Sequence, residues 1–365
     1  MPRVTERLLL GPGPSPVARR VMDAMTAPVL SHLDPEMMTI LDDIRERLDT
    51  AFQATEGSLS IAISGTGTSG MEAAVANTVR PGARAIAVVG GYFGDRLAQM
   101  LTRYGASVRR VDVEWGRACD PARLEVALHE GADLVTMVHA ETSTGVLNPV
   151  SEMCAVASAR GAMTIVDAVT SLGAHPVDAR AWGADVVYSC TQKGLGAPSG
   201  LAPITFSKRA RDSRVKAEAM GSRSFYFDLA LLEDYWLNRK YHHTISAPLV
   251  YALREALVAV ADEGLAPRWE RHRSNHLALA ARLETLGLRL LPPAGERLWS
   301  LNAVSVPDRI DDARIRTRLL DEYNIEIGAG LGPLAGKIWR VGLMGSGSTR
   351  ENVERLTGAL ETLLG

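Results

Sequence analysis

Short apolar runs recur along the first 207 residues, and stretches with helical periodicity lie between several of them. Seven runs are rich in valine and isoleucine: Leu59–Ile63, Ala85–Val89, Ser107–Val113, Leu134–Val138, Met163–Val166, Val186–Tyr188 and Ala202–Phe206. The helical stretches are Met71–Val79, Asp95–Tyr104 and Glu152–Arg160. Strands that are apolar on both faces and alternate with helices are typical of a sheet covered on both sides. The pattern therefore predicts an α/β fold with a mostly parallel seven-stranded sheet, whose strand order it does not give.

A change of pattern divides the chain near residue 264. A helix of period 3.6 is predicted over Pro248–Glu263, and Gly264 and Pro267 mark its end. We therefore expect an extended N-terminal arm over residues 1–17, a large domain over 18–264 and a smaller α+β domain over 265–365. The elements expected in the smaller domain are helices near Pro267–Leu286 and Asp311–Tyr323, strands at Leu301–Val306 and Ile338–Leu343, and a last helix opening with the capping-box pattern Ser348-Thr349-Arg350-Glu351.

Composition and charge narrow the classes of function. The 365 residues include 40 basic and 42 acidic side chains, so the sequence lacks the basic excess of a nucleic-acid-binding surface. Its apolar stretches stop far short of the roughly 20 residues that span a bilayer. Three widely separated cysteines, Cys119, Cys154 and Cys190, make no disulfide framework and fit a reducing cytoplasm. We expect a cytoplasmic protein that binds neither nucleic acid nor membrane.

The segment Gly65-Thr66-Gly67-Thr68-Ser69-Gly70 lies between an apolar run and a helix. It matches the GxGxxG pattern of dinucleotide-binding proteins, but the acidic residue that should follow about 20 positions later is missing. It is not a Walker A loop either, because no lysine follows the glycines. Two interpretations remain: a tight turn with a serine cap, or a phosphate site that uses small residues, hydroxyls and a helix N-terminus.

Two charged residues follow predicted strands. Asp167 ends the run that begins at Met163, and Lys193 comes soon after Val186–Tyr188. Of the 40 basic residues 35 are arginine, and Lys193 is the only lysine in the first 207 residues. Arginine cannot replace lysine where a deprotonated amine is needed. Because ligands bind at the carboxyl ends of parallel strands, both residues are site candidates; their alternatives are a loop-capping aspartate and a surface lysine.

A phosphate site, a carboxylate and an amine at one sheet edge together suit pyridoxal phosphate, which offers a phosphate, a ring nitrogen kept protonated by an acid, and an aldehyde that condenses with lysine. The sequence resembles the class V aminotransferases of the alanine–glyoxylate and serine–pyruvate type over nearly its whole length. The segments that carry the resemblance are Leu10-Gly11-Pro12-Gly13-Pro14-Ser15, Ser64-Gly65-Thr66-Gly67, His139-Ala140-Glu141-Thr142-Ser143-Thr144-Gly145, Val166–Gly173, Gln192-Lys193, Tyr241-His242-His243-Thr244 and Arg340-Val341-Gly342.

The resemblance implies a fold-type I pyridoxal-phosphate enzyme and a role for each matching residue. Lys193 would hold the cofactor covalently and move a proton, Asp167 would pair with the ring nitrogen, and Phe93 would stack on the ring. Thr66, Gly67, Thr68 and Gln192 would contact the phosphate, and Thr142 the edge of the ring. Tyr241 and Thr244 would reach the phosphate of a second subunit, which implies a homodimer. Arg340, with Gly13 beside it, would bind the substrate carboxylate. No metal is implied.

The expected reaction moves an amino group from a small L-amino acid, alanine or serine, to a 2-oxo acid. Glyoxylate is the first candidate for that 2-oxo acid. Serine–glyoxylate, ureidoglycine–glyoxylate, pyridoxamine–pyruvate and aminoethylphosphonate–pyruvate enzymes remain alternatives within the family. A non-catalytic pyridoxal-phosphate-binding protein and an NAD-dependent dehydrogenase are weaker alternatives from other classes.

Outside these motifs, some histidines and arginines are expected to have no chemical role. We expect His272 and His276 to form a surface pair, and Arg268, Arg271 and Arg273 to form a solvated helix face. We expect His242 and His243 to pack beside the subunit contact.

Overall fold

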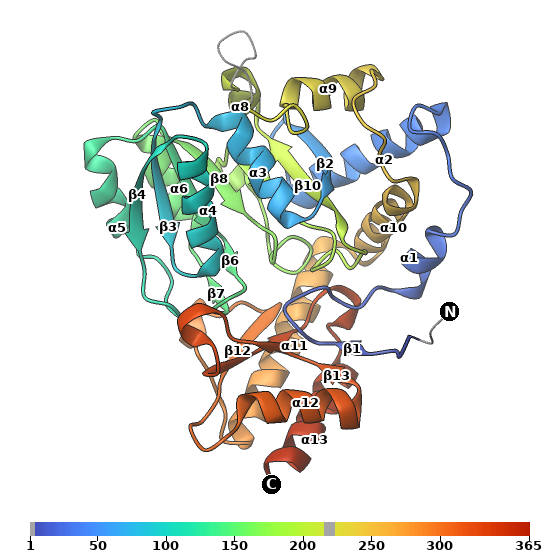
Figure 1. Ribbon diagram of the computed structural model, residues 1–365, viewed down its shortest axis with the longest axis vertical. Helices are drawn as coiled ribbons and strands as arrows, with labels where there is room; N and C mark the ends of the chain where they lie inside the picture. Colours follow the sequence, from blue (N-terminus) through green and yellow to red (C-terminus); the bar gives the residue numbers. More distant parts are fainter. Residues whose placement is uncertain (1–3, 215–222) are drawn as a thin grey trace.

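The computed structural model describes residues 4–214 and 223–365. It contains a large sheet and, below it in Figure 1, a smaller one. The large sheet has seven strands, in the order β2 (Leu59–Gly65), β10 (Gly200–Phe206), β9 (Val186–Tyr188), β8 (Met163–Asp167), β5 (Leu134–Val138), β3 (Arg84–Val89) and β4 (Ser107–Asp112). β10 runs antiparallel to both neighbours, and the other pairings are parallel. The predicted mostly parallel seven-stranded sheet is confirmed, with strand bounds that differ by a few residues at most.

Helices flank the large sheet, with α3 and α4 in front of it in Figure 1. They are α1 (Arg19–Ala24), α2 (Pro35–Phe52), α3 (Gly67–Thr78), α4 (Tyr92–Arg103), α5 (Pro121–Ala127), α6 (Val150–Ala159), α7 (Ala179–Trp182), α8 (Lys208–Ser213), α9 (Leu229–Asn238) and α10 (Ala247–Glu263). The five inner strands β10, β9, β8, β5 and β3 are almost entirely buried, as their largely apolar sequences predict.

A second sheet of four antiparallel strands lies below the first in Figure 1, with its own apolar core. Its strands, in order, are β11 (Arg289–Leu290), β12 (Leu301–Ser305), β15 (Ile338–Gly342) and β14 (Gly328–Ala329), and its helices are α11 (Leu265–Thr285), α12 (Asp312–Tyr323) and α13 (Arg350–Leu364). Gly264 separates α10 from α11. We keep the domain division at this residue as a proposal.

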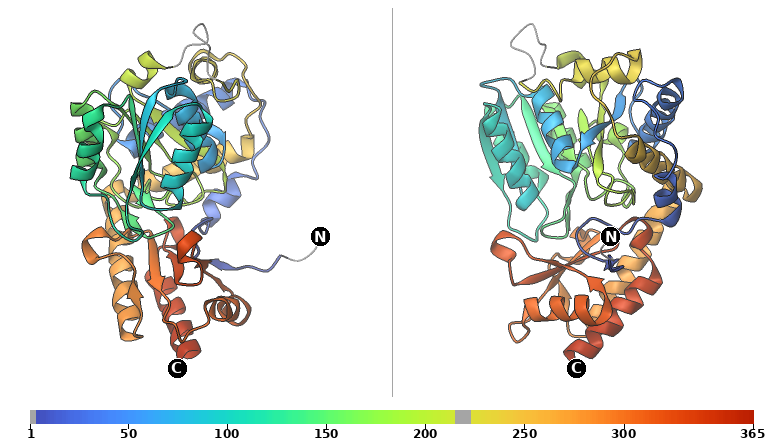
Figure 2. Two further views of the ribbon diagram at one scale, coloured as in Figure 1. Left: turned by 60° about the vertical axis from the view of Figure 1, so that its left-hand side comes forward. Right: turned by 45° about the vertical axis from the view of Figure 1, so that its right-hand side comes forward.

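The N-terminal segment joins the lower half of the molecule. β1 (Leu8–Leu9) pairs in parallel with β13 (Ile325–Glu326), and residues 4–7 extend away from the body in Figure 2. A hairpin of β6 (Ala140–Glu141) and β7 (Val146–Leu147) reaches from the large sheet toward the second sheet. Among the helices of the described residues, none has the length and apolarity needed to cross a membrane.

Three local predictions are wrong. His272 and His276 are buried, because α11 packs against the large unit on one side and the second sheet on the other. Arg268 is buried for the same reason and Arg271 is half-buried, so only Arg273 matches the expected solvated face. The last helix is capped by the Thr349 side chain, which accepts the Asn352 N–H, and not by a Ser348–Glu351 capping box.

Candidate active site

A cavity of about 280 Å³ lies at the carboxyl ends of the parallel strands, between the two sheets. The loops after β2, β8 and β9 line it, together with the start of α4, the N-terminal arm and β15. Most of the predicted site residues meet here: Gly13, Thr66, Gly67, Thr68, Phe93, Thr142, Asp167, Gln192, Lys193 and Arg340. The position of the cavity is the one that a parallel sheet favours for a ligand.

The amine of Lys193 is held between two hydroxyl groups. Its Nζ donates to Thr142 Oγ1 and to Thr170 Oγ1, each at 3.0 Å, and the two hydroxyls are 2.9 Å apart. Only 7% of the residue is exposed, so the surface-lysine alternative is wrong. Burial lowers the pKa of the amine, and the Arg340 cation acts in the same direction. A lysine with a lowered pKa can act as a nucleophile or as a base.

Asp167, at the end of β8, has a fixed carboxylate on the cavity wall. Its Oδ1 accepts the Val169 N–H at 2.8 Å, and its Oδ2 accepts the Tyr188 hydroxyl at 2.7 Å. Burial raises the pKa of this carboxyl. The Val169 contact is the loop cap considered as an alternative, but each carboxylate oxygen can still accept a further hydrogen bond. A protonated ring nitrogen would supply that donor and a compensating charge.

The glycine-rich loop presents an anion-binding surface to the cavity. β2 ends at Gly65 and α3 begins at Gly67, and no side chain caps the N-terminus of α3. The Thr68 hydroxyl accepts a hydrogen bond from Arg96 at 3.0 Å, which brings a guanidinium beside the loop. The Gln192 Oε1 is buried without a hydrogen-bond partner among the described residues. An uncapped helix N-terminus, hydroxyls and a cation suit a phosphate. The Gln192 Oε1 is an acceptor, so this residue could reach a phosphate only through its amide NH2.

Phe93 owes its place on the cavity wall to a residue that the sequence analysis did not single out. Glu141 Oε2 accepts the backbone N–H groups of Phe93 and Gly94 at 3.2 and 3.3 Å, so this buried carboxylate caps α4. A Cβ at Gly91 would collide with the Glu141 side chain, so glycine is needed there. The Phe93 ring centroid lies 5.6 Å from Lys193 Nζ. Because a cap between distant segments leaves no local pattern, sequence spacing did not reveal it.

Arg340 and Gly13 close the cavity from the side of the second sheet. Arg340, on β15, is buried, and its Nε donates to Ala329 O at 2.6 Å. Gly13 has a φ of +114°, and a Cβ there would come within 3.2 Å of the Lys193 side chain. The Ser15 hydroxyl donates to Lys193 O at 2.9 Å. The arm therefore positions the Lys193 segment directly.

Taken together, these groups fit pyridoxal phosphate. The cavity wall offers an amine for its aldehyde, a carboxylate for its ring nitrogen, an aromatic ring for stacking and donors for its phosphate. Arg340 adds a cation suited to a carboxylate.

Tyr241 and Thr244 are not part of this cavity. Both follow α9 and are exposed, with 62% of Tyr241 accessible. Between them, His243 is buried, and its Nε2 is hydrogen-bonded to Ser64 Oγ at 2.7 Å. This contact ties the segment to the end of β2, beside the glycine-rich loop.

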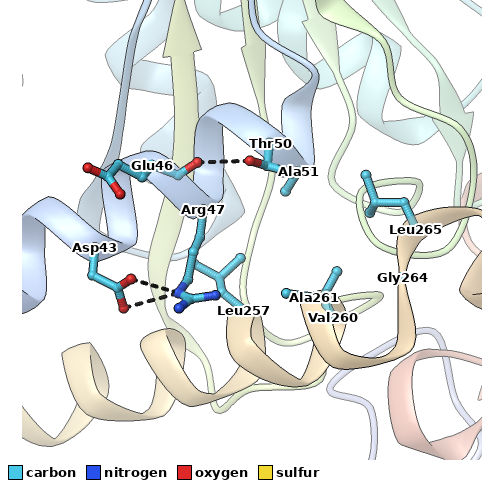
Figure 3. Close-up of a pocket in the computed structure, with 10 residues that line it drawn as sticks. All are labelled: Asp43, Glu46, Arg47, Thr50, Ala51, Leu257, Val260, Ala261, Gly264 and Leu265. Carbon is cyan, nitrogen blue, oxygen red and sulfur yellow. Dashed lines mark hydrogen bonds and ion pairs between the residues drawn. The ribbon is translucent and has the colours of Figure 1, made fainter.

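A larger cavity of about 470 Å³ lies between α2 and α10 (Figure 3). Figure 3 shows the side chain of Asp43 paired with that of Arg47, at 2.9 Å. The Thr50 hydroxyl donates to Glu46 O, and the rest of the wall is largely aliphatic. Since no predicted site residue lines it, this cavity does not carry the chemistry.

Comparisons with known proteins agree with this reading of the site. Residues 8–356 match the family model described as aminotransferase class-V. The chain is 38% identical to the (S)-ureidoglycine–glyoxylate transaminase of Bacillus subtilis, covering 98% of this chain and 90% of that protein. It is 36% identical to the alanine–glyoxylate aminotransferase of Drosophila melanogaster, covering 98% and 92%. The crystal structure of an alanine–glyoxylate aminotransferase from Nostoc sp. superposes with a TM-score of 0.96 at 46% identity, covering 100% and 96%.

Proposed function

We propose that this chain, which belongs to the class V aminotransferase family, transfers the amino group of a small L-amino acid, alanine or serine, to a 2-oxo acid. Glyoxylate is the first candidate for that 2-oxo acid. The chain is an aminotransferase that depends on pyridoxal phosphate and has the type I fold. One observation carries the proposal beyond the family: Lys193, Asp167 and Arg340 line the same small cavity. Their joint presence disfavours a non-catalytic cofactor-binding protein.

The proposed roles follow from where the side chains lie. Bound pyridoxal phosphate supplies an aldehyde that condenses with amines and a protonated ring that withdraws electrons. Asp167 would keep that ring nitrogen protonated, and the Lys193 amine would take the proton from the substrate Cα and deliver it to C4′ of the cofactor. The Thr142 and Thr170 hydroxyls keep the amine directed into the cavity.

Binding and orientation are assigned to the remaining residues of the cavity. Arg340 binds the substrate carboxylate as a bidentate guanidinium, and Gly13 leaves room beside Lys193. The phosphate is assigned to Thr66, Gly67, Thr68 and Gln192, the ring face to Phe93 and the ring edge to Thr142.

We also propose that two copies of the chain form a homodimer, in which Tyr241 and Thr244 approach the phosphate of the partner subunit. Large apolar or aromatic side chains are exposed at Val29 (75%), Phe225 (73%) and Tyr241 (62%). The His32 and Tyr241 rings lie 5.0 Å apart, so the first and last of these segments adjoin. Exposed patches of this kind mark protein interfaces. Light scattering of the purified protein tests the dimer, and a monomer at all concentrations would contradict it.

The choice among substrates rests on size. A cavity of about 280 Å³ that holds both cofactor and substrate favours short substrates such as alanine, serine and glyoxylate. The relative from Bacillus subtilis keeps ureidoglycine as the second candidate donor. The three cysteines are unpaired and buried, which supports the proposed cytoplasmic location.

The test is the visible absorption spectrum of the purified protein, before and after L-alanine is added. A yellow band that L-alanine bleaches and glyoxylate restores would support both half-reactions. A band that does not respond to L-alanine would redirect the donor to L-serine or ureidoglycine. Absence of any band after pyridoxal phosphate is added would contradict the proposal.

A further inference from the structure

Arg268, on the first turn of α11, lies inside the molecule beside the catalytic loop. Only 5% of the residue is exposed. Its Nε donates to Gly173 O at 2.9 Å, and its Nη2 donates to Gly194 O at 2.8 Å. Gly194 follows Lys193 directly in the chain. One guanidinium therefore links α11 to the loop after β8 and to the peptide group one residue beyond Lys193.

The two turns that Arg268 joins are in direct contact. Gly173 has a φ of +80°, and a Cβ there would lie 2.9 Å from Gly194 O. A Cβ at Gly194 would in turn collide with Leu172 O. The Leu195 and Ala174 side chains pack at this contact, but the two glycines leave the backbone of both turns conformationally permissive. The two hydrogen bonds from Arg268 hold the Gly173 and Gly194 carbonyl groups in place, which the permissive glycine backbone does not do by itself.

A buried guanidinium needs an anionic partner, and Glu263 provides it. Glu263 ends α10, and its Oε2 lies 2.7 Å from Arg268 Nη1. The same carboxylate binds Arg271 at 2.6 Å, and the Nη1 of Arg271 donates to Ser348 O at 2.7 Å. The pair formed by Arg268 and Glu263 is therefore anchored on both sides of the Gly264 junction.

We propose that Arg268 is a positioning residue, which fixes the backbone at Lys193 so that the lysine amine stays between Thr142 and Thr170. The inference rests on the proposed function of Lys193. The hydrogen bonds to Gly173 O and Gly194 O and the ion pair with Glu263 explain why Arg268 is buried. An exposed arginine on the same helix, Arg273, provides a matched control, because within the described part of the chain its hydrogen bonds and ion pair go to Glu270.

The experiment compares the variants R268M and R268K with R273M and the wild type. R268K keeps the charge for Glu263, but one amine cannot replace the two divergent N–H donors that reach Gly173 O and Gly194 O. It therefore keeps the test meaningful if R268M does not fold. The first measurement, on the cofactor-free chain, is hydrogen exchange of the backbone amides over residues 191–197.

The second measurement uses the loaded enzyme with L-alanine and with L-alanine deuterated at Cα. We expect both Arg268 variants to lower kcat at least tenfold, because a displacement of about 1 Å at a reacting group can cost a hundredfold in rate. KM should change less than twofold, since Arg340 is untouched. The isotope effect on kcat should rise, because transfer of the Cα proton becomes slower; a partly unfolded preparation would not alter that ratio.

Faster exchange at residues 191–197 in both Arg268 variants, with R273M like the wild type, would support the proposal. R268K with wild-type exchange, kcat and isotope effect would overturn it. If the wild type acts on neither L-alanine nor L-serine, the proposed function fails on that result alone. The exchange comparison on the cofactor-free chain still decides whether Arg268 holds the Lys193 loop.

Discussion

Replacing Thr170 by valine removes one of the two hydroxyls that accept hydrogen bonds from Lys193. Valine keeps the shape of threonine, so the change leaves the packing nearly intact. Thr170 Oγ1 lies 3.0 Å from Lys193 Nζ in a buried site. A hydrogen bond to a charged group is worth about 1.5–3 kcal/mol. Because the hydroxyl stabilises the charged amine more than the neutral one, T170V should lower the pKa of Lys193 further.

The size of the effect can be read from the rate of cofactor binding. Loss of a hydrogen bond worth about 1.5–3 kcal/mol corresponds to a roughly ten- to hundredfold rise in the ratio of neutral to charged amine at a given pH. Only the neutral amine condenses with the aldehyde of pyridoxal phosphate. The rate at which the cofactor-free T170V protein binds the cofactor should therefore reach its half-maximal value at a lower pH than in the wild type.

A matched control is present in the same region. The Thr144 hydroxyl is buried and has no hydrogen-bond partner among the described residues, so T144V removes a hydroxyl that does not contact Lys193. Stopped-flow absorbance across a pH series would follow the three proteins. If T170V gave the same profile as the wild type, or the same shift as T144V, the reasoning about Lys193 would be refuted.

Three further changes test the other groups of the site. K193M should abolish turnover. Burial lowers the pKa of Lys193 in the folded state, so between that pKa and the ordinary 10.5 the unfolded chain binds more protons than the folded chain. The free energy of unfolding of the cofactor-free wild type should therefore rise with pH in this window. Denaturant unfolding should show no such rise in K193M. R340A should raise KM for L-alanine at least tenfold through loss of a bidentate charged contact, and an unchanged KM would remove Arg340 from the carboxylate site. Y188F takes away the hydrogen bond to Asp167, which is worth about 1.5–3 kcal/mol. It should raise the pKa of Asp167 and weaken equilibrium cofactor binding roughly tenfold or more. Unaltered binding would show that Tyr188 does not support the carboxylate.

The sequence alone determined the local elements and the residues that follow them. The bounds of β5 and β9 match their apolar runs residue for residue, because a strand buried on both faces is largely apolar; Thr136 is the one polar side chain within β5. The same logic placed Asp167 and Lys193 at one sheet edge, since parallel strands end on the same side. Helix α2 is not among the elements that the apolar runs predict.

Only the tertiary structure decided which distant side chains meet. Thr170 and Glu141 complete the site through contacts to Lys193 and Phe93, and neither contact leaves a local pattern. Arg268 and His272 have a polar sequence context that predicts exposure, yet both are buried where α11 lies between the two units. Periodicity reports which face of a helix is apolar within its own segment. Burial of a polar face depends on partners far away in the chain, which hold it by hydrogen bonds and ion pairs that only folding brings together.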